Sequence, residues 1–493
     1  MRPELKEIYR IQKELKLLSG INALLGWDQN TYMPENGCYK DRAEQFSVIS
    51  RIAHKKFTSP SFQKLVNDTL AKKILKKDRM VLCRLKKDID KAKKLPPEYV
   101  EEEARVTGLA YSVWREAKNT NNFKLFKPHL KKIIELKRTE CKLKNLPGHP
   151  YNSLLDDFEE DMTTKKLKET FAYLRIELVK LLNEIKASKK YRKNVPEPEC
   201  DPDQLRKLCD FIRIKMQVTD DRSRMDATEH PFTTTIGPDD VRITTNYKRG
   251  TVDAISSTIH EAGHALYNLG LPKKYRYTAL WGGTSLGMHE SQSRFWEKVI
   301  GTNPVFWKYM YPILKQHANK IVSEEDLVFT MNNVKPSFIR VAADEITYNL
   351  HIILRFEIEL DLIEGNVEVR QLPKLWKKKM KELLGVVPKT DTEGVLQDVH
   401  WSHGILGYFP TYTLGNIYAS QLYYAMIKDN PKIMDDLQKG NYDRIIKWMR
   451  KNVHKYGRTL STEQIVEKAT GEGLNPRIFV KYLREKFTKI YDL

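Results

Sequence analysis

The sequence contains few of the features that mark secreted, membrane or cysteine-stapled proteins. It has five cysteines among 493 residues, an odd number without a CxxC pair, so neither a disulfide framework nor a cysteine zinc site is expected. No apolar run is long enough to cross a bilayer, and residues 1–20 mix charged and apolar residues, unlike a signal peptide. We therefore expect a cytoplasmic protein that does not enter a membrane.

Acidic residues are also scarce relative to basic ones. Lysine and arginine number 85 against 64 aspartates and glutamates, which gives a formal net charge of +21. Such an excess can indicate a nucleic-acid partner. The lysines, however, are interleaved with leucine and isoleucine in helical patterns, which is typical of solvated helix faces. Nucleic-acid binding is therefore not the function we favour.

Linkers and internal repeats are absent too. The length alone would suggest two or three domains, but no Pro-rich or Ser/Gly-rich run separates them. We predict one domain over residues 1–493, with a helical half over about 1–228 and a site-bearing half over about 229–493. Long amphipathic patterns predict helices, among them Pro97–Lys118 and Thr164–Ala187. The expected fold is mainly α, a single large helical body with a small β-sheet.

Strand patterns are confined to one short region. Phe232–Ile236 and Val241–Thr245 are rich in β-branched residues, and the turn sequence Gly237-Pro238-Asp239 separates them. This predicts a hairpin, whose edge can pair with an extended peptide. Further along, a helix is predicted to run from Ser337 to Glu364 and to end at Gly365.

The sequence His260-Glu261-Ala262-Gly263-His264 is the most informative stretch of the chain. Positions four apart lie on one face of a helix, so both imidazoles can reach one metal ion, and Glu261 lies close enough to act on a water. An apolar stripe at helical spacing predicts a helix here, formed by Val252, Ile255, Ile259, Ala262, Leu266 and Leu269. Gly270 and Pro272 are expected to end it. The alternative is an ordinary amphipathic helix on which these side chains pack or pair.

A catalytic zinc site needs a third protein ligand and an open position. Glu290, which lies 26 residues beyond His264, is the candidate. Ser285 is the expected N-cap of the helix that carries it. The alternative role for Glu290 is an ion pair with Arg294 at i+4.

Six short motifs in a fixed order resemble the carboxypeptidase Taq family of metallocarboxypeptidases. They are the HExxH segment at 260–264 and the segments 230–232 (HPF), 240–244 (DVRIT), 289–292 (HESQ), 339–344 (IRVAAD) and 394–401 (GVLQDVHW). The stretch 25–34 (LGWDQNTYMP) also matches the entry segment of the family. The resemblance covers nearly the whole chain, with no departure at a motif position.

The resemblance implies a fold, an activity and a set of partners. The fold would be a single helical body with a deep active-site groove. The activity would be broad-specificity removal of C-terminal residues from peptides with a free C-terminus. His260, His264 and Glu290 would hold one divalent metal per chain, zinc or alternatively cobalt, and Glu261 would be the general base. A homodimer is also implied, and this expectation rests on the family alone.

A peptidase of this kind also needs hydrogen-bond donors for the tetrahedral oxyanion. The segment 400–412 is dense in candidates. By analogy with HExxH peptidases that have a glutamate third ligand, His400 and Tyr412 are favoured, with His403 and Tyr408 in reserve. The alternative is that Tyr408 and Tyr412 are half-buried aromatics.

An enzyme that removes terminal residues must recognise a free carboxylate, for which arginine is best suited. Arg340 is favoured and Arg242 is the second candidate. The alternatives are ion pairs, of Arg340 with Asp344 at i+4 and of Arg242 with Asp240 or Asp239.

The remaining motif residues are expected to be structural or to orient the metal ligands. Each ligating histidine needs a carboxylate or carbonyl on its other ring nitrogen. Asp344, Glu345 and Asp398 are candidates for this role, and His230 and Asp240 are expected to support the hairpin.

Two other functions stay open at this point. A metal-dependent oligopeptidase or dipeptidyl carboxypeptidase would use the same chemistry on a different bond. A basic helical binding protein that has lost catalysis would explain the charge, although the four intact residues of the HExxH and HESQ motifs argue against it.

Overall fold

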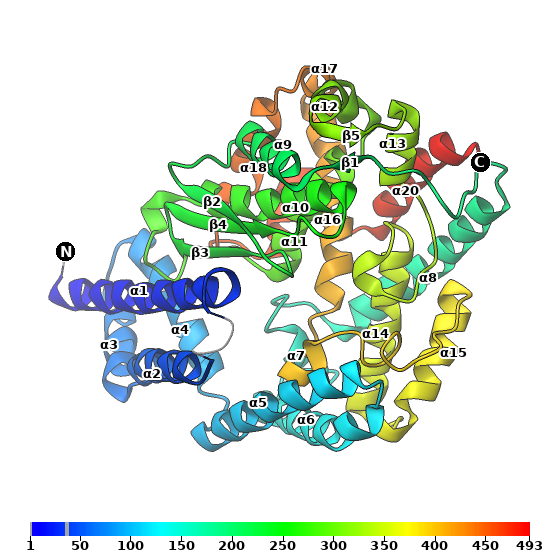
Figure 1. Ribbon diagram of the computed structural model, residues 1–493. Coiled ribbons are helices and arrows are strands. Elements are labelled where there is room, and N and C mark those ends of the chain that lie inside the picture. The colour runs from blue at the N-terminus through cyan, green and yellow to red at the C-terminus, as the bar shows by residue number, and fades with distance from the viewer. Residues whose placement is uncertain (1, 35–38) are drawn as a thin grey trace.

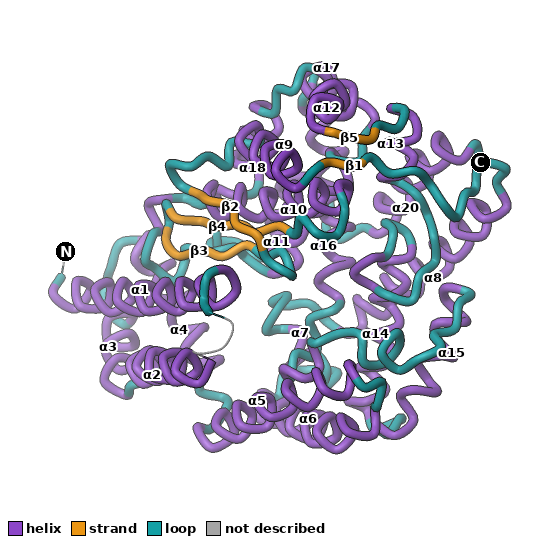
Figure 2. Tube along the Cα trace, viewed as in Figure 1, coloured by secondary structure: helices purple, strands orange, loops and turns teal. Residues whose placement is uncertain are grey.

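The computed structural model describes residues 2–34 and 39–493 of the chain. Helices follow one another through these ranges with short connections, and the strands form only small sheets (Figures 1 and 2). The expectation of a mainly α fold built as a single helical body is confirmed. Of the five cysteines, Cys38 lies outside the described residues.

The first half of the chain carries nine α-helices among the residues described. They are α1 (Pro3–Thr31), α2 (Tyr39–Phe57), α3 (Pro60–Leu70), α4 (Lys76–Ala92), α5 (Pro97–Asn119), α6 (Phe123–Lys144), α7 (Asn152–Leu155), α8 (Thr164–Ala187) and α9 (Pro202–Lys215). The predicted helix Thr164–Ala187 is confirmed at both ends, and Pro97–Lys118 is one residue short of α5.

The helices of the second half surround the HExxH segment. They are α10 (Thr251–Gly270), α11 (Leu286–Arg294), α12 (Pro304–His317), α13 (Glu324–Met331), α14 (Thr347–Glu364), α15 (Leu372–Leu384), α16 (Pro410–Asp429), α17 (Ile433–Gln438), α18 (Asp443–Asn452), α19 (Thr462–Thr470) and α20 (Pro476–Tyr491). A π-helical turn, η2 (Phe295–Ile300), continues α11, and short 3-10 turns include η3 (Arg340–Ala342) and η5 (His400–His403).

The predicted start of one helix at Ser337 is wrong. The chain forms the 3-10 turn Arg340–Ala342 there, and α14 begins only at Thr347. The reason is local capping, because Asp344 accepts hydrogen bonds from the backbone N–H groups of Ile346 and Thr347, both at 2.9 Å. The predicted end is confirmed, with Gly365 in the left-handed conformation after the last turn.

A three-stranded sheet lies beside α10. Its order is β2 (Ser223–Ala227), β4 (Asp240–Thr245) and β3 (Thr233–Gly237), with β2 parallel and β3 antiparallel to β4. The predicted hairpin is therefore confirmed, whereas β2 was not predicted. A two-stranded sheet, β1 (Glu199–Cys200) with β5 (Ala318–Lys320), was also not predicted. Because β3 is an edge strand of its sheet, its outer side is free of sheet hydrogen bonds.

The hydrophobic core is divided unequally. One large cluster of buried residues extends from Val106 on α5 to Tyr491 on α20. A smaller cluster is formed by residues of α1, α3 and α4, and it also contains Ala279 and Leu280 from the segment before α11. We call α1–α4 the N-terminal lobe, which lies to one side of the sheet (Figure 1).

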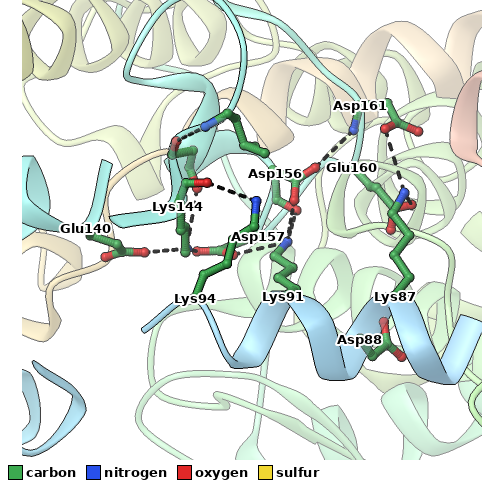
Figure 3. Close-up of polar contacts among 12 residues, drawn as sticks. Lys87, Asp88, Lys91, Lys94, Glu140, Lys144, Asp156, Asp157, Glu160 and Asp161 are labelled. Atoms are coloured by element: carbon green, nitrogen blue, oxygen red, sulfur yellow. Dashed lines mark hydrogen bonds and ion pairs between the residues drawn. The ribbon is translucent and has the colours of Figure 1, made fainter. Parts of the chain in front are cut away.

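Charged side chains join this lobe to the rest of the molecule. Lys91 on α4 forms ion pairs with Asp156 at 2.7 Å and Asp157 at 3.1 Å (Figure 3). Arg84 on the same helix pairs with Glu160 at 2.6 Å. The acidic segment 156–161 therefore rests on α4. No helix in the described ranges is long and apolar enough to span a membrane.

Candidate metal centre and active site

His260 and His264 lie on one face of α10, as their spacing predicts, and both face Glu290 on α11. Oε2 of Glu290 is 3.8 Å from Nε2 of His260 and 3.5 Å from Nε2 of His264. One ligand atom from each of the three residues lies within 4.8 Å of the others. The alternative, an ion pair between Glu290 and Arg294, is not found among the described interactions, and Arg294 pairs with Glu297 at 2.9 Å instead.

Two glycines allow α11 to approach α10 and α16 closely enough for this arrangement. A Cβ at Gly263 would lie 2.8 Å from the carbonyl oxygen of Gln292, and one at Gly415 would lie 2.8 Å from the Cβ of Glu290. Distances this short are excluded for real side chains, so both positions require the absence of a side chain. Glu290 is thus held between two helices whose backbones meet it directly.

The N-terminus of α11 is fixed by capping interactions. Ser285 accepts a hydrogen bond from the N–H of Met288 at 3.0 Å, which confirms the predicted N-cap. The N–H of Gly287 donates to the buried carboxylate of Glu159 at 3.0 Å, and the N–H of Leu286 donates to the carbonyl of Phe158 at 2.9 Å. The same acidic segment that rests on α4 therefore also holds the helix that carries Glu290.

The second ring nitrogen of each candidate ligand is also occupied. Nδ1 of His260 lies 2.7 Å from Oε2 of Glu297. Nδ1 of His264 lies 2.6 Å from Nδ1 of His289, whose Nε2 lies 3.0 Å from Oδ1 of Asn268. Such contacts leave the Nε2 atoms of both histidines pointing at Glu290.

These orienting residues differ from the predicted ones. Asp344, Glu345 and Asp398 form no contact with His260 or His264 among the described interactions. Glu297 lies two turns beyond Glu290, in the π-helical turn that continues α11. The π-helical turn shifts the register of the helix, a geometry that recurs at functional sites.

The donor set fits a divalent metal ion. Two imidazoles and one carboxylate, with an open side, are the ligands of catalytic zinc sites. Burial lowers the pKa of His260, but the carboxylates of Glu290 and Glu297 outweigh it and raise the pKa to about 9. The surrounding charge thus favours a cation between these side chains.

Glu261 lies beside this cluster in a pocket of about 380 Å³, which is also lined by His260, His264, Glu290, Tyr408 and Tyr412. The Oε2 of Glu261 accepts a hydrogen bond from the hydroxyl of Thr233 on β3 at 2.6 Å. The Thr233 hydroxyl is also 3.0 Å from the carbonyl oxygen of Glu261. Sequence reasoning missed Thr233, because only the register of β3 against α10 brings it here.

Tyr412 lines this pocket, and His400 contacts its hydroxyl without lining the pocket itself. Nε2 of His400 lies 3.3 Å from the hydroxyl of Tyr412. Burial, reinforced by Arg340, lowers the pKa of His400 to about 3, so its imidazole is neutral at pH 7. Burial holds the pKa of Tyr412 far above its usual value and raises that of Tyr408 to about 12. His403 is placed elsewhere, stacked on Tyr111 with ring centres 4.8 Å apart.

Arg340 is buried beneath the ring of Tyr412, 5.0 Å from its centre. The alternative, an ion pair with Asp344, is wrong, since the chain is not α-helical between these residues. Arg340 donates to Asp398 from Nε at 3.0 Å and from Nη2 at 2.8 Å. Asp398 also pairs with Arg355, and this bridge fixes the segment that leads to His400.

Arg242 does not point toward the metal cluster. Its neighbours Val241 and Ile243 are fully buried, and alternation along β4 places Arg242 on the opposite face of the sheet. There its guanidinium donates two hydrogen bonds to Asp240, both at 2.9 Å, which confirms the alternative prediction of an ion pair for Arg242. It also lies over the ring of Trp27. His230 is exposed and contacts Arg249 through Nδ1 at 3.2 Å.

Comparison with known proteins places the chain in a family. A model of the carboxypeptidase Taq (M32) metallopeptidases matches residues 7–487. The chain belongs to this family. It is therefore a metallocarboxypeptidase, and a divalent metal is implied, for which His260, His264 and Glu290 form the candidate site.

Relatives of this metallopeptidase match over their full length. Thermostable carboxypeptidase 1 of Pyrococcus furiosus is 36% identical, with 98% of each chain covered, and carboxypeptidase 1 of Bacillus subtilis is 38% identical, with 99% of each covered. The solved structure of the Pyrococcus furiosus carboxypeptidase has a TM-score of 0.96 at 35% identity, and Trypanosoma cruzi metallocarboxypeptidase 1 has 0.93 at 32%. Both cover 99% of each chain.

Proposed function

We propose that this metallocarboxypeptidase removes single residues from the free C-terminus of peptides, with broad specificity and one metal ion per chain. Zinc is the proposed ion and cobalt the alternative, because two imidazoles and a carboxylate are nitrogen and oxygen donors that suit both. The observation that carries the proposal is the convergence of His260, His264 and Glu290 beside the pocket-lining Glu261.

The proposed roles follow from what each side chain can donate or accept. A metal held in this site would polarise the scissile carbonyl and make a water acidic enough to attack at neutral pH. Glu261 accepts the proton of the attacking water and passes it to the leaving amine, while the Thr233 hydroxyl holds its carboxylate in place. The edge of β3 near Thr233, which lines the pocket and lies away from the contact of α1 with Ile236, is proposed to pair with the backbone of the peptide.

Tyr412 and His400 are the proposed donors to the developing oxyanion. Both are neutral at pH 7, so each can donate a hydrogen bond without an ionisation step. Tyr408, which lines the same pocket, is the reserve for this role. The position of His403 on Tyr111 does not support a catalytic role for it.

Arg340 is the proposed partner of the substrate carboxylate. Its support is the location of a buried guanidinium directly behind Tyr412. Asp398 occupies one edge of the guanidinium, and Nη1 donates to the hydroxyl of Tyr348 at 3.1 Å. The substrate carboxylate would accept a hydrogen bond from this second edge of the guanidinium. The position of Arg242 on the far face of the sheet supports only a structural role.

One experiment separates this function from its two alternatives. A short peptide and its C-terminal amide are incubated with the metal-loaded protein, and the products are identified by mass spectrometry. Stepwise loss of single residues from the free acid alone is expected. Cleavage of the amide at internal bonds would indicate an oligopeptidase, and release of dipeptides a dipeptidyl carboxypeptidase. No cleavage of either peptide would favour a binding protein that has lost catalysis.

Two further proposals concern assembly and location. A homodimer is proposed from the family resemblance, and sedimentation at micromolar concentration tests it, since a mass of 57.8 kDa would contradict it. A cytoplasmic location is proposed as well, and cell fractionation tests it.

A further inference from the structure

A second cavity lies within the N-terminal lobe. Its volume is about 360 Å³, and its walls come from α1, α2, α4, the segment 278–279 and Arg458. None of the residues that line it also lines the metal pocket. Cavities of this size are typical of small-molecule sites.

Two polar side chains of α1 reach this cavity without a matching partner. Gln12 is 3% exposed, and its Oε1 accepts a hydrogen bond from the N–H of Ala279 at 2.8 Å. Its Nε2 is buried with no hydrogen-bond partner among the described residues. Lys16 forms no ion pair in the same part of the chain, and its Nζ donates to the carbonyl of Trp281 at 3.3 Å. Because residues 12 and 16 are four apart on one helix, the two nitrogens are neighbours.

The charges around Lys16 do not neutralise it. Arg458 donates to Asp88 from both Nη atoms at 2.9 Å, and Arg84 pairs with the same carboxylate at 2.9 Å. Arg84 also pairs with Glu160 at 2.6 Å, so both arginines have carboxylate partners, and the ammonium of Lys16 adds a positive charge that has none among the described residues. Burial and then the charge of Arg458 lower the pKa of Lys16 to about 8, against the opposing effect of Asp88. An anion in the cavity would relieve the repulsion.

The rest of the lining is largely apolar, and this sets the chemistry of the occupant. Leu15, Phe57 and Leu85 provide hydrophobic surface close to the two nitrogens. We propose that the cavity binds a small monocarboxylic acid with an apolar body, whose carboxylate meets Lys16 Nζ and Gln12 Nε2. The single ammonium of Lys16, which has no carboxylate partner among the described residues, matches a monoanion, and burial of the apolar body supplies the hydrophobic contribution.

Two sources share this chemistry, an acid without an amino group and an apolar amino acid of the kind that a carboxypeptidase releases. An amino acid would also need a partner for its ammonium group. Asp88 is the carboxylate in the cavity wall, and two arginines already occupy it. The acid without an amino group is therefore the favoured occupant.

Calorimetric titration of the full-length, metal-loaded protein tests the proposal. The probes are 3-phenylpropionate, its amide 3-phenylpropionamide, and L-phenylalanine. The acid is expected to bind at least about tenfold more tightly than the amide, because the amide carries no charge. If L-phenylalanine binds as tightly as the acid, the occupant of the cavity is the released amino acid. If it binds more weakly, the occupant is an acid without an amino group.

Variants assign the binding to this cavity. Lys16→Gln is expected to weaken the binding of 3-phenylpropionate at least about tenfold, and Gln12→Leu is expected to weaken it a few-fold. Lys13→Gln, at an exposed position on the same helix, should leave the affinity unchanged. Undiminished binding in Lys16→Gln would overturn the proposal. So would equal binding of acid and amide, or binding that disappears only when the metal is removed, since that would assign the acid to the metal pocket.

A second measurement on the unmodified sequence does not depend on a variant folding. Acetic anhydride at pH 8 acetylates lysines, and peptide mass mapping follows each site. 3-Phenylpropionate is expected to slow acetylation of Lys16 several-fold while leaving Lys13 unaffected. Equal rates at Lys16 with and without the acid would contradict the proposal.

Discussion

The metal centre and the N-terminal lobe are held together in different ways. At the metal centre, α10, α11 and α16 meet at backbone contact through Gly263 and Gly415, and the charged side chains between them are buried. The lobe instead has a small apolar cluster, and many of its charged pairs lie at the surface, such as Lys86 with Asp90.

This difference predicts where the molecule tolerates change. Water cannot solvate a buried charge that loses its partner. A methyl group added at a close backbone contact has no free space to occupy. An exposed pair of charges is screened by water and contributes little. Substitutions at the metal centre should therefore have large effects, and removal of exposed ion pairs in the lobe should have small ones.

The largest effect is expected from Glu261→Gln. The amide cannot accept the proton of the attacking water, so kcat/KM should fall by roughly three or more orders of magnitude. The fold and the metal content should be unchanged, because the side-chain shape is kept. Steady-state hydrolysis of a blocked dipeptide, with metal analysis of the same sample, measures both. A rate near that of the original protein would place the general base elsewhere.

Gly415→Ala should be the next most damaging change. The new Cβ would overlap the side chain of Glu290, so α11 must move away from α16. We expect a loss of stability of about 1–3 kcal/mol and at least about tenfold weaker metal binding. Gly108→Ala on α5 is the matched control, because nothing lies within 4 Å of its added Cβ and alanine favours a helix. Equal metal affinity in the two variants would contradict the close-packing explanation.

Arg340→Ala should lower kcat/KM for free peptides at least about tenfold, since one charge-assisted contact contributes on the order of 1.5–3 kcal/mol. Hydrolysis of the amidated peptide should be no slower in the variant than in the original protein. Arg355 would still pair with Asp398 in the variant. The contrary result is lower thermal stability with unchanged discrimination between acid and amide. That outcome would leave Arg340 a purely structural partner of Asp398.

The smallest effect is expected in the lobe. Lys86→Ala removes an exposed i,i+4 pair with Asp90 on α4, so stability should change by no more than about 0.5 kcal/mol. Urea unfolding of the variant beside the original protein measures it. A change above about 1 kcal/mol would show that the surface ion pairs of the lobe contribute more to stability than exposed pairs usually do.

The same contrast explains what the sequence could predict. The HExxH pair, the N-cap Ser285 and the candidate ligand Glu290 follow from local spacing, and so do the hairpin and most helix limits. Glu297 and His289 lie on the predicted helix or beside it, yet their contacts with the two histidines depend on how closely α11 approaches α10. That approach is set by glycines whose neighbours lie on other helices.

Other misses have a similar cause. The ion pair of Arg340 with Asp344, the alternative that the sequence offered, depends on i+4 spacing in an α-helix, and the chain forms a short 3-10 turn instead. The actual partner, Asp398, lies 58 residues further along. The unpredicted strand β2 pairs in parallel with β4, a contact without a local turn signal.

The central claim is that His260, His264 and Glu290 hold the metal on which hydrolysis depends. Glu290→Gln tests it most directly, with metal content and peptide hydrolysis measured on one preparation after equilibration with zinc at known free concentrations. Occupancy and activity are expected to fall together, and higher zinc concentrations are expected to restore both in parallel. Full occupancy with normal turnover in this variant would contradict it.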